Sequence, residues 1–192
     1  MRVKKENAID VLSSEQLRDI MSGAEDLRDR CLIGLGVEAA CRVGEMSHWR
    51  VSSFDFRYLT AIKYDVKKKE PRRVGITKEL ADQVKLYVNT ARLKDGPLFP
   101  GRFAGEPISE KTVDQVLKDL TAKAGIEGWI SWHCLRHTYC SLAAMRNVTI
   151  DEVRYVTGDS LQTIMRYYKK PIPQDMGKWM SDLYRPNPCP EV

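Results

Sequence analysis

The spacing of apolar side chains divides the sequence into helical segments and one stretch of strictly alternating residues. Over most of its length apolar residues recur every three or four positions, as in a helix that buries one face. This pattern predicts helices near residues 13–21, 27–40, 77–88, 109–120, 133–142, 149–157 and 161–168. The fold is therefore expected to be mainly α, with the remaining regular structure in a small sheet.

Residues 56–67 follow a period of two instead. Positions 56, 58, 60, 62, 64 and 66 are mostly apolar, and Arg57, Lys63, Asp65 and Lys67 lie between them. Such alternation predicts a half-buried strand with its apolar face inward and with Lys67 on the polar face. The turn 68–71 and the segment 73–76 supply a return strand, so a small antiparallel sheet is expected (α+β class).

Short polar signals mark the ends of several predicted helices. Residues 13–16 (Ser-Ser-Glu-Gln) and 149–152 (Thr-Ile-Asp-Glu) have the form of capping boxes, which start helices. Gly158 is expected to terminate the helix that the second box begins. Arg42 lies at or just past the end of the predicted helix 27–40.

The length and charge of the chain narrow the range of partners. With 192 residues, 43% of them hydrophobic, one core with a small appendage is expected, hence a single domain. The net charge is only +5, but five of the seven residues from 67 to 73 are basic, and Lys169 and Lys170 follow two tyrosines. Such clusters favour a polyanionic partner, although a solvated charged turn has the same composition.

The cysteines and histidines indicate neither disulfides nor a metal site. Among five cysteines and three histidines there is no Cys-x-x-Cys pair and no metal-ligand spacing. Buried thiols in a reducing compartment are expected, with no metal and no cofactor. No apolar run is long enough to cross a bilayer, and the first residues lack a signal-peptide pattern, so we expect a cytoplasmic protein.

His133 and Arg136 are the first candidates for chemistry. They stand three residues apart, so they lie on one side of a predicted helix, whose other side carries Leu135, Tyr139 and Leu142. An imidazole beside a planar guanidinium suits the non-bridging oxygens of a phosphate. The alternative is a helix start with a capping histidine and a surface arginine.

Four short segments, far apart in the sequence, form one set. They are Arg42-Val-Gly-Glu45, the basic hairpin 67–76, His133-x-x-Arg136-His137-Thr and Gln162-Thr-Ile-Met-Arg-Tyr167. In order and spacing they resemble the catalytic domain of the tyrosine recombinases, also called the phage integrase family. The resemblance implies that family's catalytic-domain fold over residues 12–170, with residues 1–11 as a lead-in and 171–192 as a C-terminal arm.

The resemblance also implies an activity and a set of catalytic residues. A site-specific recombinase or integrase would cleave and rejoin DNA through a 3′-phosphotyrosyl link at Tyr167, without a metal. Arg42 and Arg136 would neutralise the charge that develops on the phosphate, because a phenol is a poor nucleophile at neutral pH. His133 would assist by hydrogen bonding or proton transfer, and Glu45 would be a partner of Arg42.

In this family a hairpin lysine protonates the departing 5′ oxygen. The family spacing, counted back from Val74, selects Lys67. Lys68 and Lys69 remain alternatives, because a shift of one position would change the choice.

Two adjacent tyrosines could provide the nucleophile. Helical phase places Tyr168 on an apolar stripe with Leu161 and Ile164, and Tyr167 away from it. The family motif Gln-Thr-x-x-Arg-Tyr ends at the same residue. We therefore expect Tyr167 to be the nucleophile and Tyr168 to be part of the core.

The chain departs from the family pattern before the tyrosine helix. Gly158 stands where the family usually has a histidine, and Asp159 follows it. Asp159 is given no catalytic role, because an aspartate would repel a phosphate. A DNA-binding regulator that has lost catalysis is therefore an alternative, and a type IB topoisomerase-like enzyme that relaxes DNA is another.

The family resemblance implies double-stranded DNA as the partner and no membrane. Self-association is expected on DNA, with a tetramer in synapsis and a monomer or weak dimer without DNA. Family members usually carry an N-terminal DNA-clamping domain, so the chain is either an excised catalytic fragment or a naturally minimal enzyme. Apolar residues at 172, 176, 179, 180 and 183 predict a C-terminal helix that docks on its own domain or, as in related recombinases, on a neighbouring protomer.

Overall fold

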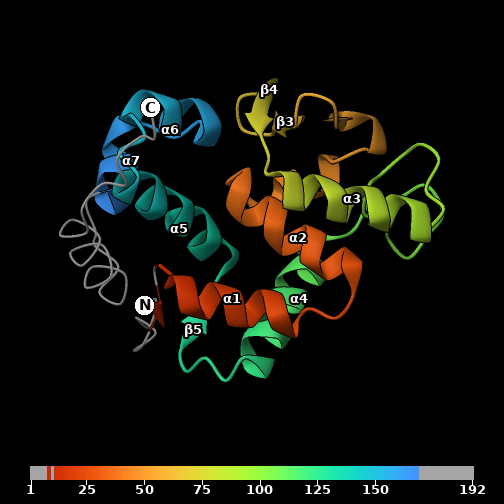
Figure 1. Ribbon diagram of the computed structural model, residues 1–192, viewed down its shortest axis with the longest axis horizontal. Helices are drawn as coiled ribbons and strands as arrows, with labels where there is room; N and C mark the ends of the chain where they lie inside the picture. Colours follow the sequence, from red (N-terminus) through yellow and green to blue (C-terminus); the bar gives the residue numbers. More distant parts are fainter. Residues whose placement is uncertain (1–7, 10, 169–192) are drawn as a thin grey trace, which may run out of the picture.

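The computed structural model describes residues 8–9 and 11–168. Its helices are α1 (Ser14–Gly23), α2 (Leu27–Glu38), α3 (Lys78–Thr90), α4 (Glu110–Lys123), α5 (Trp132–Met145), α6 (Ile150–Thr157) and α7 (Leu161–Tyr168). Two short 3₁₀ helices, η1 (Val43–His48) and η2 (Val51–Ser53), lead from α2 into the sheet. These elements confirm the predicted mainly α class with a small sheet (Figure 1).

The principal sheet has three antiparallel strands, β2 (Phe54–Asp55), β3 (Thr60–Asp65) and β4 (Glu70–Gly75), in that order. The ladder between β3 and β4 runs from the pair Thr60 and Gly75 to the pair Asp65 and Glu70. A separate two-residue parallel pair joins β1 (Ala8–Ile9) to β5 (Trp129–Ile130). In Figure 1, β3 and β4 lie near the top of the view, and α6, to which Arg72 of β4 is hydrogen-bonded, lies between them and α7.

The local signals for helix ends are confirmed. Ser13 and Thr149 each form a complete capping box with the residue three positions later. Thr77 and Ser109 cap α3 and α4 through their side-chain oxygens. Gly158 terminates α6 in the left-handed conformation, with φ of 72°.

The apolar core has two parts. The larger cluster is formed by α1 to α4, the sheet and the first half of α5. Helices α2 and α5 approach closely there, because a Cβ at Gly36 would lie 2.8 Å from atoms of both Trp132 and Leu135. The smaller cluster joins the second half of α5 to α6 and α7, and its buried residues are Cys140, Ala143, Val153 and Ile164.

The predicted orientation of strand β3 is wrong. Its buried residues are Ala61, Lys63 and Asp65, whereas Ile62 and Tyr64 are 48% and 37% exposed. The alternation is real, but the charged face turns inward. It does so because helix ends and opposite charges, described below, supply the hydrogen bonds and ion pairs that a buried lysine and a buried aspartate need.

Several expectations fall partly or wholly outside the described residues. Cys31, Cys41, Cys134 and Cys140 are buried cysteines outside any disulfide, as expected, whereas Cys189 is not described. The predicted C-terminal arm, 171–192, also lies beyond the described part of the chain. Within residues 8–9 and 11–168, no helix is long and apolar enough to span a membrane.

Candidate active site

Three successive backbone carbonyls after α2 are bound by side chains from other elements. Lys63 Nζ donates to Ala39 (2.9 Å), Arg136 Nη1 to Ala40 (2.6 Å) and Trp132 Nε1 to Cys41 (3.0 Å). The last carbonyls of a helix lack partners within it and carry partial negative charge, so cations are favoured there. The end of α2 therefore helps to position Lys63 and Arg136.

The end of α6 repeats this arrangement. Arg72 Nη1 donates to the carbonyl of Tyr155 (2.9 Å), Lys63 Nζ to that of Val156 (2.7 Å) and Arg136 Nη2 to that of Thr157. Lys63 and Arg136 thus join the ends of two helices, and their side chains are only 1% and 2% exposed. Burial lowers the pKa of Lys63 below that of an exposed lysine.

Arg42, which precedes η1, is held by Glu45. The Glu45 carboxylate accepts from the Arg42 backbone N–H (3.0 Å) and from its Nη1 (2.9 Å). The same carboxylate lies 3.6 Å from Lys63 Nζ and is buried. Glu45 is therefore the buried anionic partner of two cations, as the sequence hypothesis proposed for Arg42.

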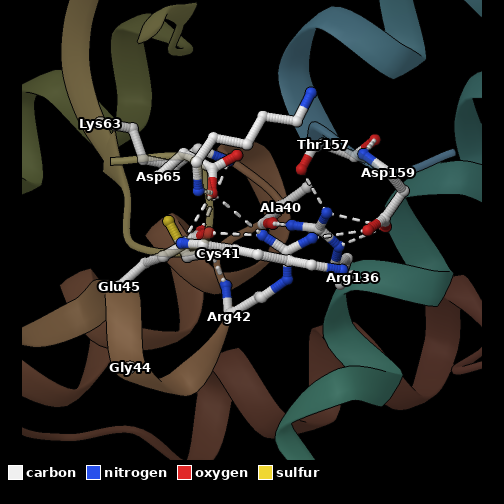
Figure 2. Close-up of polar contacts among 12 residues, drawn as sticks. Ala40, Cys41, Arg42, Gly44, Glu45, Lys63, Asp65, Arg136, Thr157 and Asp159 are labelled. Atoms are coloured by element: carbon white, nitrogen blue, oxygen red, sulfur yellow. Dashed lines mark hydrogen bonds and ion pairs between the residues drawn. The ribbon is translucent and has the colours of Figure 1, made fainter. Parts of the chain in front are cut away.

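The carboxylate of Asp159 links the two arginines (Figure 2). Arg42 Nη2 donates to Oδ1 (2.6 Å), and Arg136 approaches Oδ2 with both Nε (2.9 Å) and Nη2 (2.7 Å). Burial alone would raise the pKa of Asp159, but the charges and hydrogen bonds of Arg136 and Arg42 outweigh it and hold that pKa below its ordinary value. The two arginines therefore direct donors at one shared anion.

Asp65 connects this cluster to the basic hairpin turn. Its Oδ1 accepts from the backbone N–H groups of Lys67 and Lys68 (3.1 Å each) and lies 3.6 Å from Arg42 Nη1. Its Oδ2 lies 3.2 Å from Arg72 Nε. The side chain of Lys67 is exposed in this turn, so the structure anchors its backbone beside Arg42 and leaves its amine facing solvent.

The position that aligns with the family histidine has no room for a side chain. Gly158 has a positive φ, and a Cβ there would lie 2.5 Å from Asp65 Oδ2 and 3.2 Å from Arg72 Cζ. Only glycine combines the left-handed conformation with this close approach. The local structure at position 158 thus fits a glycine and not a histidine.

The two tyrosines on α7 have different partners. The ring of Tyr167 stacks on His137 of α5, with centroids 3.5 Å apart and an angle of 11° between the planes. The hydroxyl of Tyr168 donates to the carbonyl of Val148. Both rings are half-buried against the smaller cluster, so the expectation that Tyr167 points away from the apolar side is wrong, whereas Tyr168 does pack as expected.

Helix α5 connects the tyrosine to the arginines. Ser141 Oγ donates to the carbonyl of Tyr167 (3.0 Å), one turn after His137. His133 lies exposed in the first turn of α5, with its ring centroid 6.3 Å from that of His137. The helix pattern predicted that Arg136 projects on the same side as His133. Instead, Arg136 is buried between the two helix ends, whereas His133 is exposed.

The sequence and the fold were compared with those of known proteins. Residues 10–172 match the phage integrase family. The chain belongs to this family. It is 26% identical over 161 residues to the tyrosine recombinase XerA of Pyrococcus horikoshii, a match that covers 83% of this chain and 56% of that protein.

Solved structures of family members share the fold. A crystal structure of XerA recombinase has a TM-score of 0.79 at 20% identity, covering 94% of this chain and 68% of that one. A XerH site-specific recombinase bound to palindromic difH substrate in a post-cleavage complex has a TM-score of 0.74 at 18% identity, covering 96% and 56%. This integrase-family chain spans about half the length of the curated relatives it matches.

Family membership places the sequence-predicted residues in a common frame. Arg42 and Arg136 meet at one carboxylate, the rings of His133 and Tyr167 both lie near that of His137, and Lys67 is tied through its backbone to Asp65.

The sequence patterns did not indicate that Lys63 and Asp65 are buried charges, nor that Asp159 binds both arginines. Nothing local marks Lys63 as buried, since its carbonyl partners lie 24 and 93 residues away. The departure from the family pattern at Gly158 and Asp159 was the available signal for an altered site.

Proposed function

We propose that this chain is the catalytic domain of a site-specific DNA recombinase or integrase, with residues 12–170 forming that domain. The observation that carries the proposal is the convergence of Arg42 and Arg136 on a single anionic group. Two guanidinium groups aimed at one point suit a phosphodiester whose negative charge increases in the transition state. Membership of the phage integrase family supports the same chemistry.

In this proposal Tyr167 Oη attacks the phosphorus of the scissile phosphodiester. A bond forms between the phenolic oxygen and phosphorus, and the bond to the 5′ oxygen breaks. The phenol proton passes to His133 or to water, and the exposed amine of Lys67 protonates the departing 5′ oxygen. Attack by a 5′ hydroxyl from another strand reverses these steps and releases Tyr167.

Double-stranded DNA is the proposed substrate. The exposed lysines of the β3–β4 turn lie beside the arginine cluster and would contact the phosphate backbone. The XerH relative is bound to a palindromic substrate, and a palindrome presents the same half-site to two copies of a protein. We therefore propose self-association on DNA, with a tetramer in synapsis and a monomer or weak dimer without DNA.

A second candidate is a DNA-binding regulator with impaired catalysis. Gly158 occupies the histidine position, and Asp159 neutralises the arginines that would hold the phosphate. Such a protein would bind DNA at the same surface without forming a covalent link. The two candidates differ in one observable product, the phosphotyrosyl adduct.

The test begins with duplexes that the protein selects from a random-sequence library. Nicked versions of these duplexes trap any covalent intermediate, and mass spectrometry of the peptide–DNA product locates the modified residue. We expect the adduct at Tyr167, its loss in Tyr167→Phe with DNA affinity nearly unchanged, and its retention in Tyr168→Phe. Tight binding without an adduct at any tyrosine would favour the regulator instead.

A further inference from the structure

Asp159 is the residue whose contacts the family comparison leaves unexplained. Its carboxylate lies between Arg42 and Arg136, with one oxygen directed at each (Figure 2). An aspartate that repelled the substrate would be expected to point away from these donors. Instead, its position is that of a bound anion.

The nitrogens of the Arg136 guanidinium group are all hydrogen-bonded, to two backbone carbonyls and to Asp159. Nη1 donates to the carbonyl of Ala40, and Nη2 donates to that of Thr157. These backbone acceptors are fixed at the ends of helices and form the floor of the site. The remaining edge, formed by Nε and Nη2, faces Asp159. Because the Arg136 side chain is only 2% exposed, a phosphate reaches this edge by taking the place of the Asp159 carboxylate.

Arg42 imposes the same requirement. Its Nη1 is bound to Glu45, which is buried, and its Nη2 is bound to Asp159. Without an anion between them, the two guanidinium groups would repel each other across a partly buried space. Asp159 therefore both separates the arginines by a fixed distance and competes for their donors.

The location of Asp159 would allow a phosphate to replace its carboxylate. It lies in the three-residue connection between α6 and α7, after the glycine that ends α6. Its side chain is 19% exposed, whereas those of the other two carboxylates of this cluster, Glu45 and Asp65, are each 1% exposed. A rotation of this side chain toward solvent frees both arginines without moving a helix.

We propose that Asp159 is an internal substitute for the DNA phosphate, which holds Arg42 and Arg136 in their working arrangement and is displaced when a phosphate binds. This inference rests on the proposed function, because it takes the arginines to be the phosphate clamp. The competition lowers the apparent affinity for phosphate by the fraction of molecules in which Asp159 occupies the clamp. It also keeps the clamp assembled before DNA arrives.

Inorganic phosphate is the first probe. Thermal unfolding is followed in sodium phosphate and in sodium chloride of equal ionic strength, for the wild type, Asp159→Asn and Asp159→Ser. Asp82→Asn on α3 is the control with the same change in net charge, since Asp82 is exposed and its ion pairs with described residues are with Lys78 and Lys85. The matched ionic strength removes general screening from the comparison.

We expect both Asp159 variants to unfold at lower temperature than the wild type in chloride and to be stabilised selectively by phosphate. Their apparent phosphate affinity should exceed that of the wild type and of Asp82→Asn by roughly tenfold, the scale of one charge-assisted contact. Equal phosphate dependence in all four proteins would overturn the proposal. If the Asp159 variants are unfolded in chloride, phosphate must restore folding, and its failure to do so would also overturn the proposal.

The second probe is the nicked duplex described above, at concentrations below saturation. Asp159→Asn should form the Tyr167 adduct roughly tenfold faster than the wild type, because the phosphate no longer has a competitor. A folded Asp159→Asn protein that forms the adduct more slowly than the wild type would show that the carboxylate is needed during the reaction and contradict displacement. No adduct from any protein would count against the proposed function, while the phosphate measurement would still decide the role of Asp159.

Discussion

The two parts of the apolar core hold their helices in different ways. Around α2 and α4 the buried residues form one large apolar cluster, which reaches into the first half of α5. The cluster that holds α6 and α7 has few buried apolar residues, and its connections to the rest of the molecule are largely polar. Lys63, Arg72 and Arg136 bind the end of α6, and Asp159 binds both arginines of the site.

This difference indicates that the site and the attachment of α6 share a set of polar contacts. Apolar burial stabilises the larger part, whereas the end of α6 and its connection to α7 also depend on buried ions with good geometry. Segments with few buried apolar contacts open at lower free energy than the core does. The helix that carries Tyr167 is therefore expected to be repositioned more easily than the helices of the larger cluster.

Removal of Arg136 should produce the largest effect on this arrangement. Arg136→Ala leaves the carbonyls of Ala40 and Thr157 and the carboxylate of Asp159 without their partner. We expect a loss of about 3 kcal/mol in the free energy of unfolding, as for other broken buried pairs. Adduct formation should fall by roughly a hundredfold or more, the scale for loss of one oxyanion donor.

Arg136→Lys is the matched variant for this prediction. It keeps the charge but loses the planar fork that reaches two carbonyls and Asp159 together, so it should rescue stability in part and cleavage poorly. Urea denaturation and the nicked-duplex assay measure the two effects separately. Near-normal cleavage by Arg136→Ala would eliminate it as part of the clamp.

A pair of identical substitutions tests the contrast between the two clusters directly. Ile33 and Ile164 are both buried, the first in the large cluster and the second in the small one. Ile33→Ala should lower the free energy of unfolding by about 3 kcal/mol. Ile164→Ala should lower global stability less, by about 1–2 kcal/mol, because fewer neighbours lose contacts around the site.

Amide hydrogen exchange distinguishes local from global loss in this pair. In Ile164→Ala we expect faster exchange confined to α6 and α7, together with slower adduct formation. In Ile33→Ala the loss of protection should extend through α2 and α3. The same global destabilisation and the same exchange pattern in both variants would mean that the two clusters unfold as one unit, and the contrast would be incorrect.

Some parts of this architecture could be predicted from the sequence because their causes are local. The capping boxes at Ser13 and Thr149 bring together residues only three positions apart, and both form. The four motifs of the family also identified Arg42 and Arg136 as a pair, although they are far apart in the sequence. The meeting point of that pair on Asp159 depends on contacts across 117 and 23 residues, which no periodicity reveals.

The buried face of β3 shows why the remainder could not be predicted. Alternation fixes which residues share a face, but the choice of face depends on what covers the strand. Here the covering surface consists of helix ends, which favour Lys63, and of arginines, which favour Asp65. A rule that turns apolar residues inward fails wherever the interior itself is charged.

Replacing Gly158 with the usual family histidine tests whether the contacts at the end of α6 exclude a side chain. Gly158→His places a side chain in a left-handed conformation and against Asp65 and Arg72. We expect the free energy of unfolding to fall by about 2 kcal/mol or more, because of the left-handed strain and the displaced ion pair. Adduct formation should not increase.

Gly125→His is the matched control for this substitution. Gly125 follows α4 with φ of 64°, and a Cβ there meets nothing within 4 Å. The free energy of unfolding of Gly125→His should therefore fall by about 1 kcal/mol, from the left-handed strain alone. Equal losses in the two variants would show that the contacts with Asp65 and Arg72 do not constrain position 158, and faster cleavage by Gly158→His would show that the histidine still fits.

The smallest expected effect is a change in how stability depends on pH. The folded-state pKa of Asp159 lies below the ordinary value of 3.8, so the ionised form is the one that folding favours. Its contribution is fully present above the unfolded pKa and is lost as the pH falls from about 4 through the lower, folded value. The stability difference between the wild type and Asp159→Asn, measured in chloride, should therefore be constant near neutral pH, at about 1–2 kcal/mol, and shrink below pH 4. A difference that stays the same down to pH 2 would mean that the negative charge of Asp159 does not hold the arginines together, and the polar attachment of α6 would then rest on the bonds that Lys63, Arg72 and Arg136 donate to its last carbonyls.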